Sequence, residues 1–362
     1  MSDRAAPGQT RGRGARSNGS SRFDSERRVW VDDGWGGPDE WQDGAPGIRT
    51  TETADATRTI IARNQSPDIS FDRSINPYRG CEHGCIYCFA RPTHAYLGLS
   101  PGIDFETKLL YKPEAAVLLE KELRAKSYRC RTIAIGTNTD PYQPIERRRM
   151  ITREILKVLA RFNHPVGIVT KSDLVVRDLD ILAPMAEKGL AKVALSVTTL
   201  DHRLARSMEP RASTPARRID AIRKLSEAGV RTAVMAAPLI PSLNEPEMEA
   251  ILERARDAGA TEAGYILVRL PLEIADLFQE WLETEVPDRA SRIMRLIRDM
   301  RGGKAYDAAF GKRMSGSGPY AAMMGRRFRI AARRLGLNER KLLLETGLFS
   351  PPPAPGDQLS LL

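Results

Sequence analysis

The chain of 362 residues has room for one barrel-sized domain with extensions, or for two smaller domains. Its hydrophobic fraction of 41% supplies a sizeable core, and the lack of an apolar run long enough to cross a bilayer argues against a membrane protein. Four cysteines are too few for a disulfide framework and no signal peptide is recognisable, so we expect a cytoplasmic protein with reduced thiols. The formal net charge of +10 predicts an anionic partner.

Residues 1–60 have the composition of a disordered N-terminal arm. They are rich in Gly, Arg, Ser, Asp and Thr and show no periodic apolar pattern, although Trp30, Trp35 and Trp41 could dock locally. The run 11–16, Arg-Gly-Arg-Gly-Ala-Arg, resembles a flexible arm that contacts nucleic acid. A solvated tail is the simpler interpretation of that run.

Residues 61–270 alternate between strand and helix patterns. Strands are predicted over 70–75, 132–135, 166–170, 192–197, 231–235 and 265–268, and helices over 114–126, 145–161, 174–187, 215–228 and 245–258. Prolines lie near several helix starts and glycines follow several helix ends, as is typical of helix caps. Strands joined by crossover helices predict a parallel sheet, so we expect an α/β fold, a partial (β/α)6 TIM-like barrel. The active site of such a barrel lies at the carboxyl ends of its strands.

Three of the four cysteines are grouped directly after the first predicted strand, in the motif Cys81-x3-Cys85-x2-Cys88. Thiolates suit iron–sulfur clusters and zinc, and both a structural zinc ion and a four-iron cluster call for four ligands. Three cysteines therefore leave one position vacant. His83 or His94 could fill it in a Cys3His zinc site, and a disulfide with one spare thiol is a weaker alternative.

Polar residues also follow the later strands, at the same end of the predicted barrel. The second strand leads into a turn over 136–146, the third into 170–172, and the fourth into 196–199 and then 209–218. Lys171 and Arg211 in these segments could bind a carboxylate. Ordinary turn and capping chemistry explains each segment taken alone.

The cysteine motif and the aromatic residue after it closely resemble the radical SAM superfamily. More narrowly, the chain resembles an SplB-like bacterial family related to spore photoproduct lyase, over roughly residues 66–270. The resemblance implies that Cys81, Cys85 and Cys88 ligate a [4Fe–4S] cluster whose fourth iron holds S-adenosylmethionine. It also implies the cofactor-binding residues, which are Thr137, Asn138, Thr139, Asp140, Lys171, Ser196 and Arg211.

The same resemblance implies a reaction class. An electron donor such as flavodoxin or ferredoxin would reduce the cluster, S-adenosylmethionine would be cleaved to a 5′-deoxyadenosyl radical, and the radical would abstract a hydrogen atom. Spore photoproduct lyase uses a further cysteine as hydrogen donor, where this chain has Gly136 and Thr137. Cys130 precedes its strand and is expected at the opposite end of the barrel, in a structural role. Tyr142 or another tyrosine could relay a radical, so the catalytic donor stays unknown.

Residues 271–346 predict a basic, mainly helical extension. Positions 291–341 contain fourteen Lys or Arg against three acidic residues, a net charge of +11, so the rest of the chain sums to −1. Apolar residues recur at helical spacing through 324–335, and Arg326, Arg329 and Arg333 fall on the opposite face. We expect these arginines to contact nucleic acid phosphates, the alternative being a solvated face. Positions 311–319 predict a mobile basic loop beside this helix.

Residues 347–362 form a Pro-rich tail. Its linker at 350–356 should stay extended outside the core, and its last residues resemble the peptide that binds the bacterial sliding clamp. Those residues are Gln358, Leu359, Ser360, Leu361 and Leu362. A frayed apolar tail is the alternative.

The leading hypothesis is a radical SAM enzyme, lyase-like in class, that repairs or modifies nucleic acid, and DNA in particular. One alternative is a radical SAM enzyme that acts on tRNA, on a protein or on a small metabolite. A second, from a different class, is a DNA-binding adaptor stapled by zinc.

Overall fold

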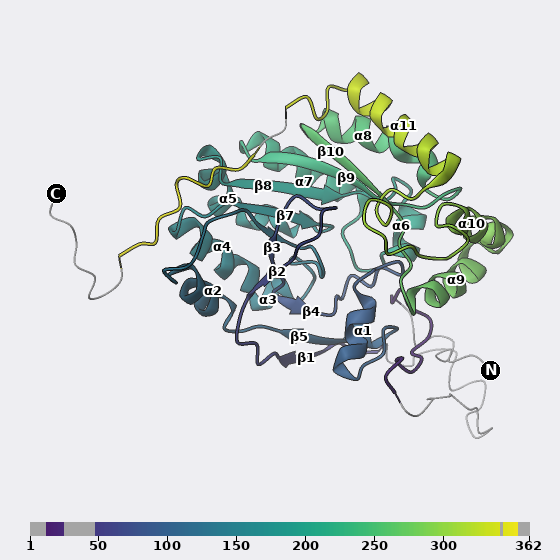
Figure 1. Ribbon diagram of the computed structural model, residues 1–362, viewed down its shortest axis with the longest axis horizontal. Helices are drawn as coiled ribbons and strands as arrows, with labels where there is room; N and C mark the ends of the chain where they lie inside the picture. The colour runs from purple at the N-terminus through teal and green to yellow at the C-terminus, as the bar shows by residue number, and fades with distance from the viewer. Residues whose placement is uncertain (1–11, 25–47, 341–342, 354–362) are drawn as a thin grey trace.

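The computed structural model describes residues 12–24, 48–340 and 343–353, and its centre is one open, mainly parallel sheet (Figure 1). The strand order is β10-β9-β8-β7-β6-β3-β2. Six of these strands run parallel in chain order, and β2 pairs antiparallel with β3 at one edge. Their bounds are β2 (Ile61–Arg63), β3 (Arg73–Ile75), β6 (Ile133–Ile135), β7 (Val166–Thr170), β8 (Ala191–Ser196), β9 (Arg231–Leu239) and β10 (Glu262–Leu267).

Helices connect the parallel strands and pack on the sheet. The longer ones are α2 (Ala115–Leu123), α4 (Ile151–Arg161), α5 (Leu179–Glu187), α7 (Pro215–Glu227) and α8 (Met248–Asp257). The shorter ones are η1 (Arg91–Leu97), α1 (Asp104–Thr107), α3 (Glu146–Arg149), η2 (Asp173–Asp178), α6 (His202–Met208) and η3 (Glu245–Glu247). The expectation of a partial (β/α)6 barrel is confirmed, and the sheet does not close: among the described strands, β2 and β10 are its edges.

Amphipathic spacing explains why these helices form where they do. In α4, Ile151, Ile155 and Leu159 recur every four residues and are buried against the sheet. The helix predicted over 145–161 is interrupted at Met150, whose φ of 51° ends α3 and starts α4. The helix predicted over 174–187 likewise begins with the 3-10 turn η2 before α5.

A second, three-stranded sheet is a feature that the sequence did not predict. Its order is β1-β5-β4, from β1 (Thr51–Ala54), β5 (Lys108–Tyr111) and β4 (Tyr78–Arg79). It lies at the lower edge of the view in Figure 1, beside α1. Strands of two to four residues carry too few side chains to show an alternating pattern, which is why they were missed.

The predicted disordered arm does not hold for residues 12–24 and 48–60. Ala15 is fully buried, and the Arg13 guanidinium donates to the Ile48 and Glu106 carbonyls and to the Thr50 hydroxyl. A segment with several buried hydrogen bonds to distant parts of the chain is part of the folded body.

The C-terminal extension is helical, as expected, with α9 (Ile274–Glu285), α10 (Pro287–Asp299) and α11 (Gly318–Arg334). Helix α11 packs on α8 through its apolar stripe, in which Met324, Phe328 and Ala331 are buried. In none of the helices that the structure describes is there an apolar stretch of membrane-spanning length.

The predicted mobile loop between α10 and α11 is instead anchored to both edges of the sheet. The Leu267 backbone at the end of β10 donates to the Met314 carbonyl at 2.9 Å. On the other side, Gly311 donates its backbone N–H to the Asp68 carboxylate at 2.7 Å, and the Arg313 guanidinium pairs with the same carboxylate. Because Asp68 lies between β2 and β3, this loop bridges the two open edges of the sheet.

The chain beyond α11 returns along the barrel before residue 354. Phe349 packs against Tyr128, Phe162 and His164, and the Arg124 guanidinium donates to the Pro352 carbonyl at 2.8 Å. The Pro-rich linker is therefore docked over 350–352, contrary to the expectation that it stays outside the core. The clamp-like peptide at 358–362 lies outside the described residues.

His164 gives the fold a specific dependence on pH. It is fully buried, its Nε2 lies 2.7 Å from the Tyr128 hydroxyl, and burial lowers its pKa to about 4. An unfolded histidine titrates near 6.5, so below that pH the unfolded chain binds a proton that the folded chain refuses. Stability is thus lost as pH falls from about 6.5 towards 4.

We expect His164→Gln to remove this dependence. The free energy of unfolding of the wild-type chain, taken relative to that of the variant, should fall by about 2 kcal/mol between pH 8 and pH 5. Urea denaturation of both chains at the two pH values measures it. An unchanged difference would show that His164 is protonated in the folded state.

Candidate functional site

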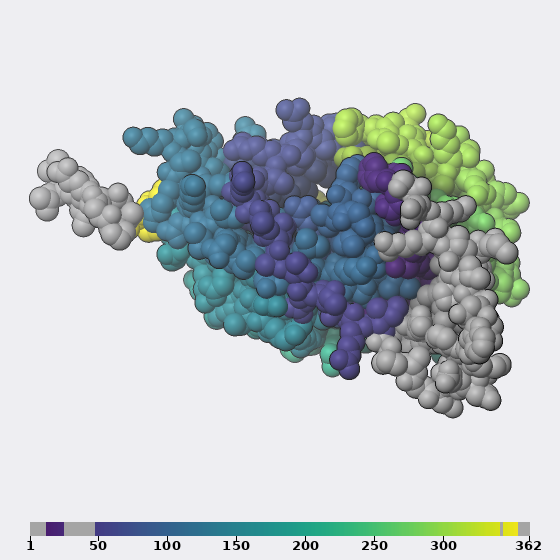
Figure 2. All heavy atoms as spheres, turned by 90° about the horizontal axis from the view of Figure 1, so that it is seen from below, coloured from purple at the N-terminus to yellow at the C-terminus, as the bar shows by residue number. Residues whose placement is uncertain are grey.

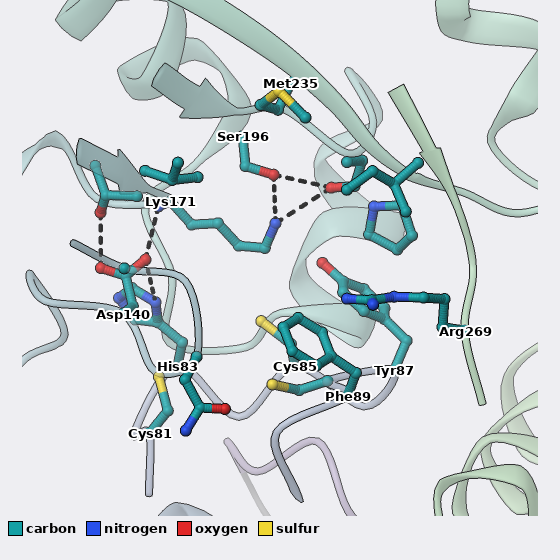
Figure 3. A pocket seen from close by; sticks show the side chains of 18 of the residues that line it. Cys81, His83, Cys85, Tyr87, Phe89, Asp140, Lys171, Ser196, Met235 and Arg269 are labelled. Atoms are coloured by element: carbon teal, nitrogen blue, oxygen red, sulfur yellow. Dashed lines mark hydrogen bonds and ion pairs between the residues drawn. The ribbon is translucent and has the colours of Figure 1, made fainter. Parts of the chain in front are cut away.

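A cavity opens at the carboxyl ends of the parallel strands and reaches the cysteine loop, residues 80–89 (Figure 3). The loop forms one wall. The ends of β7, β8, β9 and β10 form the others, together with the turn after β6. The lining residues are Cys81, His83, Cys85, Tyr87, Cys88, Phe89, Gly136, Asn138, Asp140, Val169, Thr170, Lys171, Ser196, Met235, Ala237, Pro238, Ile266, Leu267 and Arg269.

Glycines allow the cysteine loop to fold tightly against its surroundings. Gly80 has φ +77° and Gly84 has φ +68°, a region that residues with a side chain rarely adopt. A Cβ on Gly80 would lie 2.9 Å from the Phe105 carbonyl oxygen, and one on Gly84 would lie 2.6 Å from the Glu106 carboxylate. Both positions therefore require glycine.

A buried arginine holds the backbone of this loop. The Arg91 side chain is fully buried, and its Nε donates to the Cys85 carbonyl at 2.9 Å while Nη2 donates to the Gly84 carbonyl at 3.0 Å. Its Nη1 donates to the Pro101 and Gly102 carbonyls. The N–H groups of the Arg91 guanidinium thus all point at acceptors in one stretch of the folded chain.

Glu106 neutralises this arginine and extends the same network to the N-terminal segment. Its fully buried carboxylate pairs with Arg91 and also accepts the backbone N–H groups of Gly14 at 3.0 Å and Ala15 at 2.8 Å. Breaking a buried pair of this kind leaves an uncompensated charge, which is strongly destabilising.

Residues 12–24 continue from Ala15 across the outside of the cysteine loop to the C-terminal extension. The Asn18 amide donates to Asp104, the Ser17 hydroxyl donates to Glu280 of α9 at 2.8 Å, and Arg22 pairs with Glu273. Figure 2 shows the purple N-terminal residues between blue and green surfaces of the molecule. The cysteine loop is therefore packed between the barrel, the N-terminal segment 12–24 and helix α9.

Lys171 and Ser196 lie on the wall opposite the cysteines. The Lys171 ammonium donates to the Ser196 hydroxyl at 2.6 Å and to the Ala237 carbonyl at 3.3 Å, and it lies 3.6 Å from the Glu209 carboxylate. Burial and the charge of Arg218, against the opposite effect of nearby Cys85, together lower the pKa of Lys171 to about 8.

Asp140 fixes the turn after β6 beside this lysine. Its carboxylate accepts the Lys171 backbone N–H at 2.7 Å and the Thr170 hydroxyl at 2.7 Å, and His83 Nδ1 lies 3.4 Å away. Burial acts to raise the pKa of Asp140, but the imidazole and these hydrogen bonds lower it to about 2. Asp140 thus joins the cysteine loop, through His83, to the strand that carries Lys171.

A second buried network lies beneath the cavity and was only partly expected. The Tyr87 hydroxyl and the Thr198 hydroxyl both donate to Glu209, and the Arg218 guanidinium pairs with the other oxygen of this carboxylate. Glu209 and Arg218 belong to the segment 209–218, which the sequence marked, but nothing singled out Tyr87. It is the tyrosine that lines the cavity, whereas Tyr142 donates to Asp178 and does not line it.

The three thiols fit an iron–sulfur cluster better than a single metal ion. They are free, they come from one loop, and burial raises the pKa of each one, an effect that bound cationic iron would reverse. Among the described residues, no three His, Cys, Asp or Glu side chains are placed to share one ion. His83 Nδ1 lies 3.4 Å from Asp140 and His94 Nε2 lies 2.9 Å from the Lys108 carbonyl. Within the described residues, neither histidine is grouped with the thiols around a single ion, as the alternative zinc site would require.

The remaining candidates divide between the cavity and its surroundings. Asn138, Asp140, Lys171 and Ser196 line it, but Thr137, Thr139 and Arg211 do not. The Thr139 hydroxyl donates to the Tyr78 carbonyl at 2.7 Å, and Arg211 pairs with Glu82. The exposed face of α11 holds Arg326, Arg329 and Arg333, while Cys130 is partly buried before β6.

Arg91→Met tests the network that supports the cysteine loop. The substitution strands the Glu106 carboxylate and several carbonyl groups in the interior, so the free energy of unfolding should fall by about 3–5 kcal/mol. Arg124→Met, at a partly exposed arginine of the helix layer, is the matched control and should lose about 1 kcal/mol. Urea denaturation of the metal-free proteins measures both, and equal losses would contradict the central role of Arg91.

Comparison with known proteins agrees with this architecture. The chain is similar to spore photoproduct lyase complexed with dinucleoside spore photoproduct, with a TM-score of 0.57, 16% identity and coverage of 79% of this chain and 80% of that one. A mutant of spore photoproduct lyase in which a tyrosine is replaced by phenylalanine matches with the same TM-score and 17% identity, over the same shares of the two chains. At these identities the likeness concerns the fold.

Sequence comparison identifies the family. An uncharacterised protein of Mycobacterium tuberculosis (strain ATCC 25618 / H37Rv) is 38% identical over 242 residues, which cover 66% of this chain and 71% of that protein. An uncharacterised protein of Methanocaldococcus jannaschii is 30% identical over 173 residues, or 48% of this chain and 62% of that protein. The family model described as the radical SAM superfamily matches residues 75–255. The chain therefore belongs to the radical SAM superfamily, whose enzymes use a [4Fe–4S] cluster and S-adenosylmethionine.

Proposed function

We propose that Cys81, Cys85 and Cys88 hold the [4Fe–4S] cluster and that S-adenosylmethionine occupies the remaining coordination position in the same cavity. The observation that carries this proposal is the meeting of three free thiols with the Lys171 and Ser196 side chains across one cavity. When bound, the reduced cluster supplies the electron that cleaves the cofactor into methionine and a 5′-deoxyadenosyl radical.

The side chains opposite the cysteines have the chemistry to hold the amino-acid end of the cofactor. Lys171 supplies a cation for the carboxylate, since its ammonium is already oriented by Ser196 and Ala237. Asp140 positions Lys171 by accepting the Lys171 backbone N–H, and it holds the cysteine loop in place through His83. The apolar residues of the cavity, among them Val169 and Met235, exclude water from the radical.

We further propose nucleic acid, and DNA in particular, as the substrate. The net charge of +11 over 291–341 and the exposed arginines of α11 support an anionic polymer as partner. A dinucleoside photoproduct is bound by spore photoproduct lyase, which shares the fold. The cysteine donor of that enzyme has no counterpart after β6, so we propose repair or modification of a base without assigning the same reaction.

The experiment is anaerobic reconstitution of the full chain, followed by measurement of iron and of 5′-deoxyadenosine. We expect about four irons per chain, and cofactor cleavage with a reductant such as dithionite or flavodoxin. Adding DNA, adding RNA or adding neither then separates a DNA enzyme from one acting on tRNA, a protein or a metabolite. A colourless chain with bound zinc and no cleavage would refute the enzyme function.

Cysteine substitutions test the ligand assignment. Cys81→Ala, Cys85→Ala or Cys88→Ala should each abolish retention of the cluster, because two thiolates cannot hold the four-iron cube. Cys130→Ala is the matched control and should keep the wild-type iron content and visible absorption. Loss of iron in Cys130→Ala, or its retention in two of the three loop variants, would overturn the assignment.

Charge substitutions test the nucleic acid surface. Replacing Arg326, Arg329 and Arg333 together by Gln should weaken duplex DNA binding and flatten its salt dependence by up to about three phosphate contacts, or about 2.7 in the logarithmic slope. Fluorescence anisotropy across a salt series measures both.

A matched triple variant controls for the general loss of charge. Lys121, Lys157 and Arg223 are exposed on α2, α4 and α7, and their joint replacement by Gln removes the same charge from the helix layer. This variant should keep most of the wild-type slope. Equal slopes for both triple variants would show that the α11 arginines are only a solvated face.

A further inference from the structure

Arg269 is a cation of the cavity that the cofactor assignment does not use. It lies just after β10 and lines the cavity beside Phe89, with its guanidinium carbon 4.0 Å from the centre of the Phe89 ring. Figure 3 shows it next to Tyr87 and Phe89, across the cavity from Asp140 and Lys171. Two different cations therefore face the cavity from separate walls.

Within the described part of the chain, no carboxylate or carbonyl accepts a hydrogen bond from Arg269. Burial lowers the pKa of its guanidinium; the charges of Arg313 and Arg301 lower it further, while Tyr306 acts the other way. A guanidinium in a half-buried site normally finds acceptors, because leaving its donors unmade is costly. The aromatic face of Phe89 offers it attraction but no acceptor.

The two neighbouring arginines, in contrast, each donate to several acceptors, although Arg301 Nε has no partner among the described residues. Arg301 is buried and donates to the carbonyls of Leu267, Val268, Lys312 and Arg313. Arg313 pairs with Asp68 and donates to the Ser66 hydroxyl. Both therefore serve to fix the loop over 300–317 across the open side of the barrel. Arg269 has no comparable acceptor among the described residues.

Aromatic surface is exposed beside Arg269, at Phe89, and on the loop over 300–317, at Phe310. Phe89 is 39% exposed and Phe310, on the bridging loop, is 60% exposed, with the Arg313 guanidinium 4.9 Å from the centre of its ring. Exposed aromatic faces beside cations are the elements with which proteins bind single-stranded nucleic acid, through base stacking and phosphate contacts. A planar guanidinium fork matches a phosphate with two hydrogen bonds.

We propose that Arg269 binds a backbone phosphate of the nucleic acid substrate, while the target nucleotide enters the cavity past Phe89. This inference rests on the proposed function and names the contact by which that site recognises its substrate. Cys81 and Cys85 are buried on one wall of the cavity, so a base reaches the radical only when it has left a helical stack. A single strand presents such a base without an unpairing cost.

The test uses the full-length, cluster-loaded protein and fluorescein-labelled oligo(dT), with binding followed by anisotropy over a salt series. Arg269→Gln should bind about tenfold more weakly and lose about 0.7 from the logarithmic salt slope, the value for one phosphate contact on a single strand. Arg269→Lys keeps the charge but not the fork, so it should keep the slope at an intermediate affinity. Arg223→Gln, on the surface of α7, is the control and should bind as the wild type does.

The outcomes separate this inference from the proposed function. Wild-type binding with no loss of affinity or slope in Arg269→Gln overturns the phosphate contact alone. Weaker binding of S-adenosylmethionine by Arg269→Gln, with oligo(dT) binding intact, assigns the guanidinium to the cofactor carboxylate and also overturns it. A wild-type chain that cleaves the cofactor but binds neither oligo(dT) nor duplex DNA overturns the DNA substrate as well. Thermal unfolding checks that the variants are folded, and Arg269→Lys keeps the test decisive if the Gln variant is not.

Discussion

The buried pair of Arg91 and Glu106 is the interaction on which this site depends. A loop that presents three thiols to one cavity has no regular secondary structure, so its buried carbonyl groups need partners from elsewhere. Arg91 supplies them for Gly84 and Cys85, and Glu106 balances the charge that this requires. The pair is fully buried, so it stabilises the loop only while both of its members are present. The conformation of the cysteine loop is thereby fixed by contacts within the protein core.

The same carboxylate explains why segments outside the barrel belong to the site. Glu106 accepts two backbone N–H groups from residues 12–24, and that segment continues to α9 through Ser17 and Arg22. On the other side, the loop over 300–317 joins β10 to the β2–β3 connection. An open barrel leaves a gap between its two edge strands; the loop over 300–317 spans that gap, while residues 12–24 cover the outer side of the cysteine loop. A radical intermediate needs this kind of shelter from solvent.

The sequence predicted those parts of the fold and site that depend on local pattern. The strand over 166–170 is predicted at its observed bounds because a short run rich in β-branched residues is typical of a buried strand. Lys171, Ser196 and Asp140 follow strand ends, which meet at one edge of a parallel sheet, and the family resemblance implies their place in the cofactor site; all three line the cavity. Thr139 and Arg211 show the limit of that reasoning: residues of one turn point in different directions, and only the folded backbone shows which of them face the cavity.

The distribution of charge in and around the cavity leads to a final point about specificity. Glu106, Glu209 and Asp140 are buried carboxylates, and each has a cationic or imidazole partner within the folded chain. Such matched groups fix structure and are unavailable to a ligand, because exchanging partners would strand a charge in the interior. Lys171 and Arg269 differ, since the first bonds mainly to neutral oxygens and the second stacks on an aromatic ring. Two cations on opposite walls can hold two separate anions, which under the functions proposed above would be the carboxylate of the cofactor and a phosphate of the substrate.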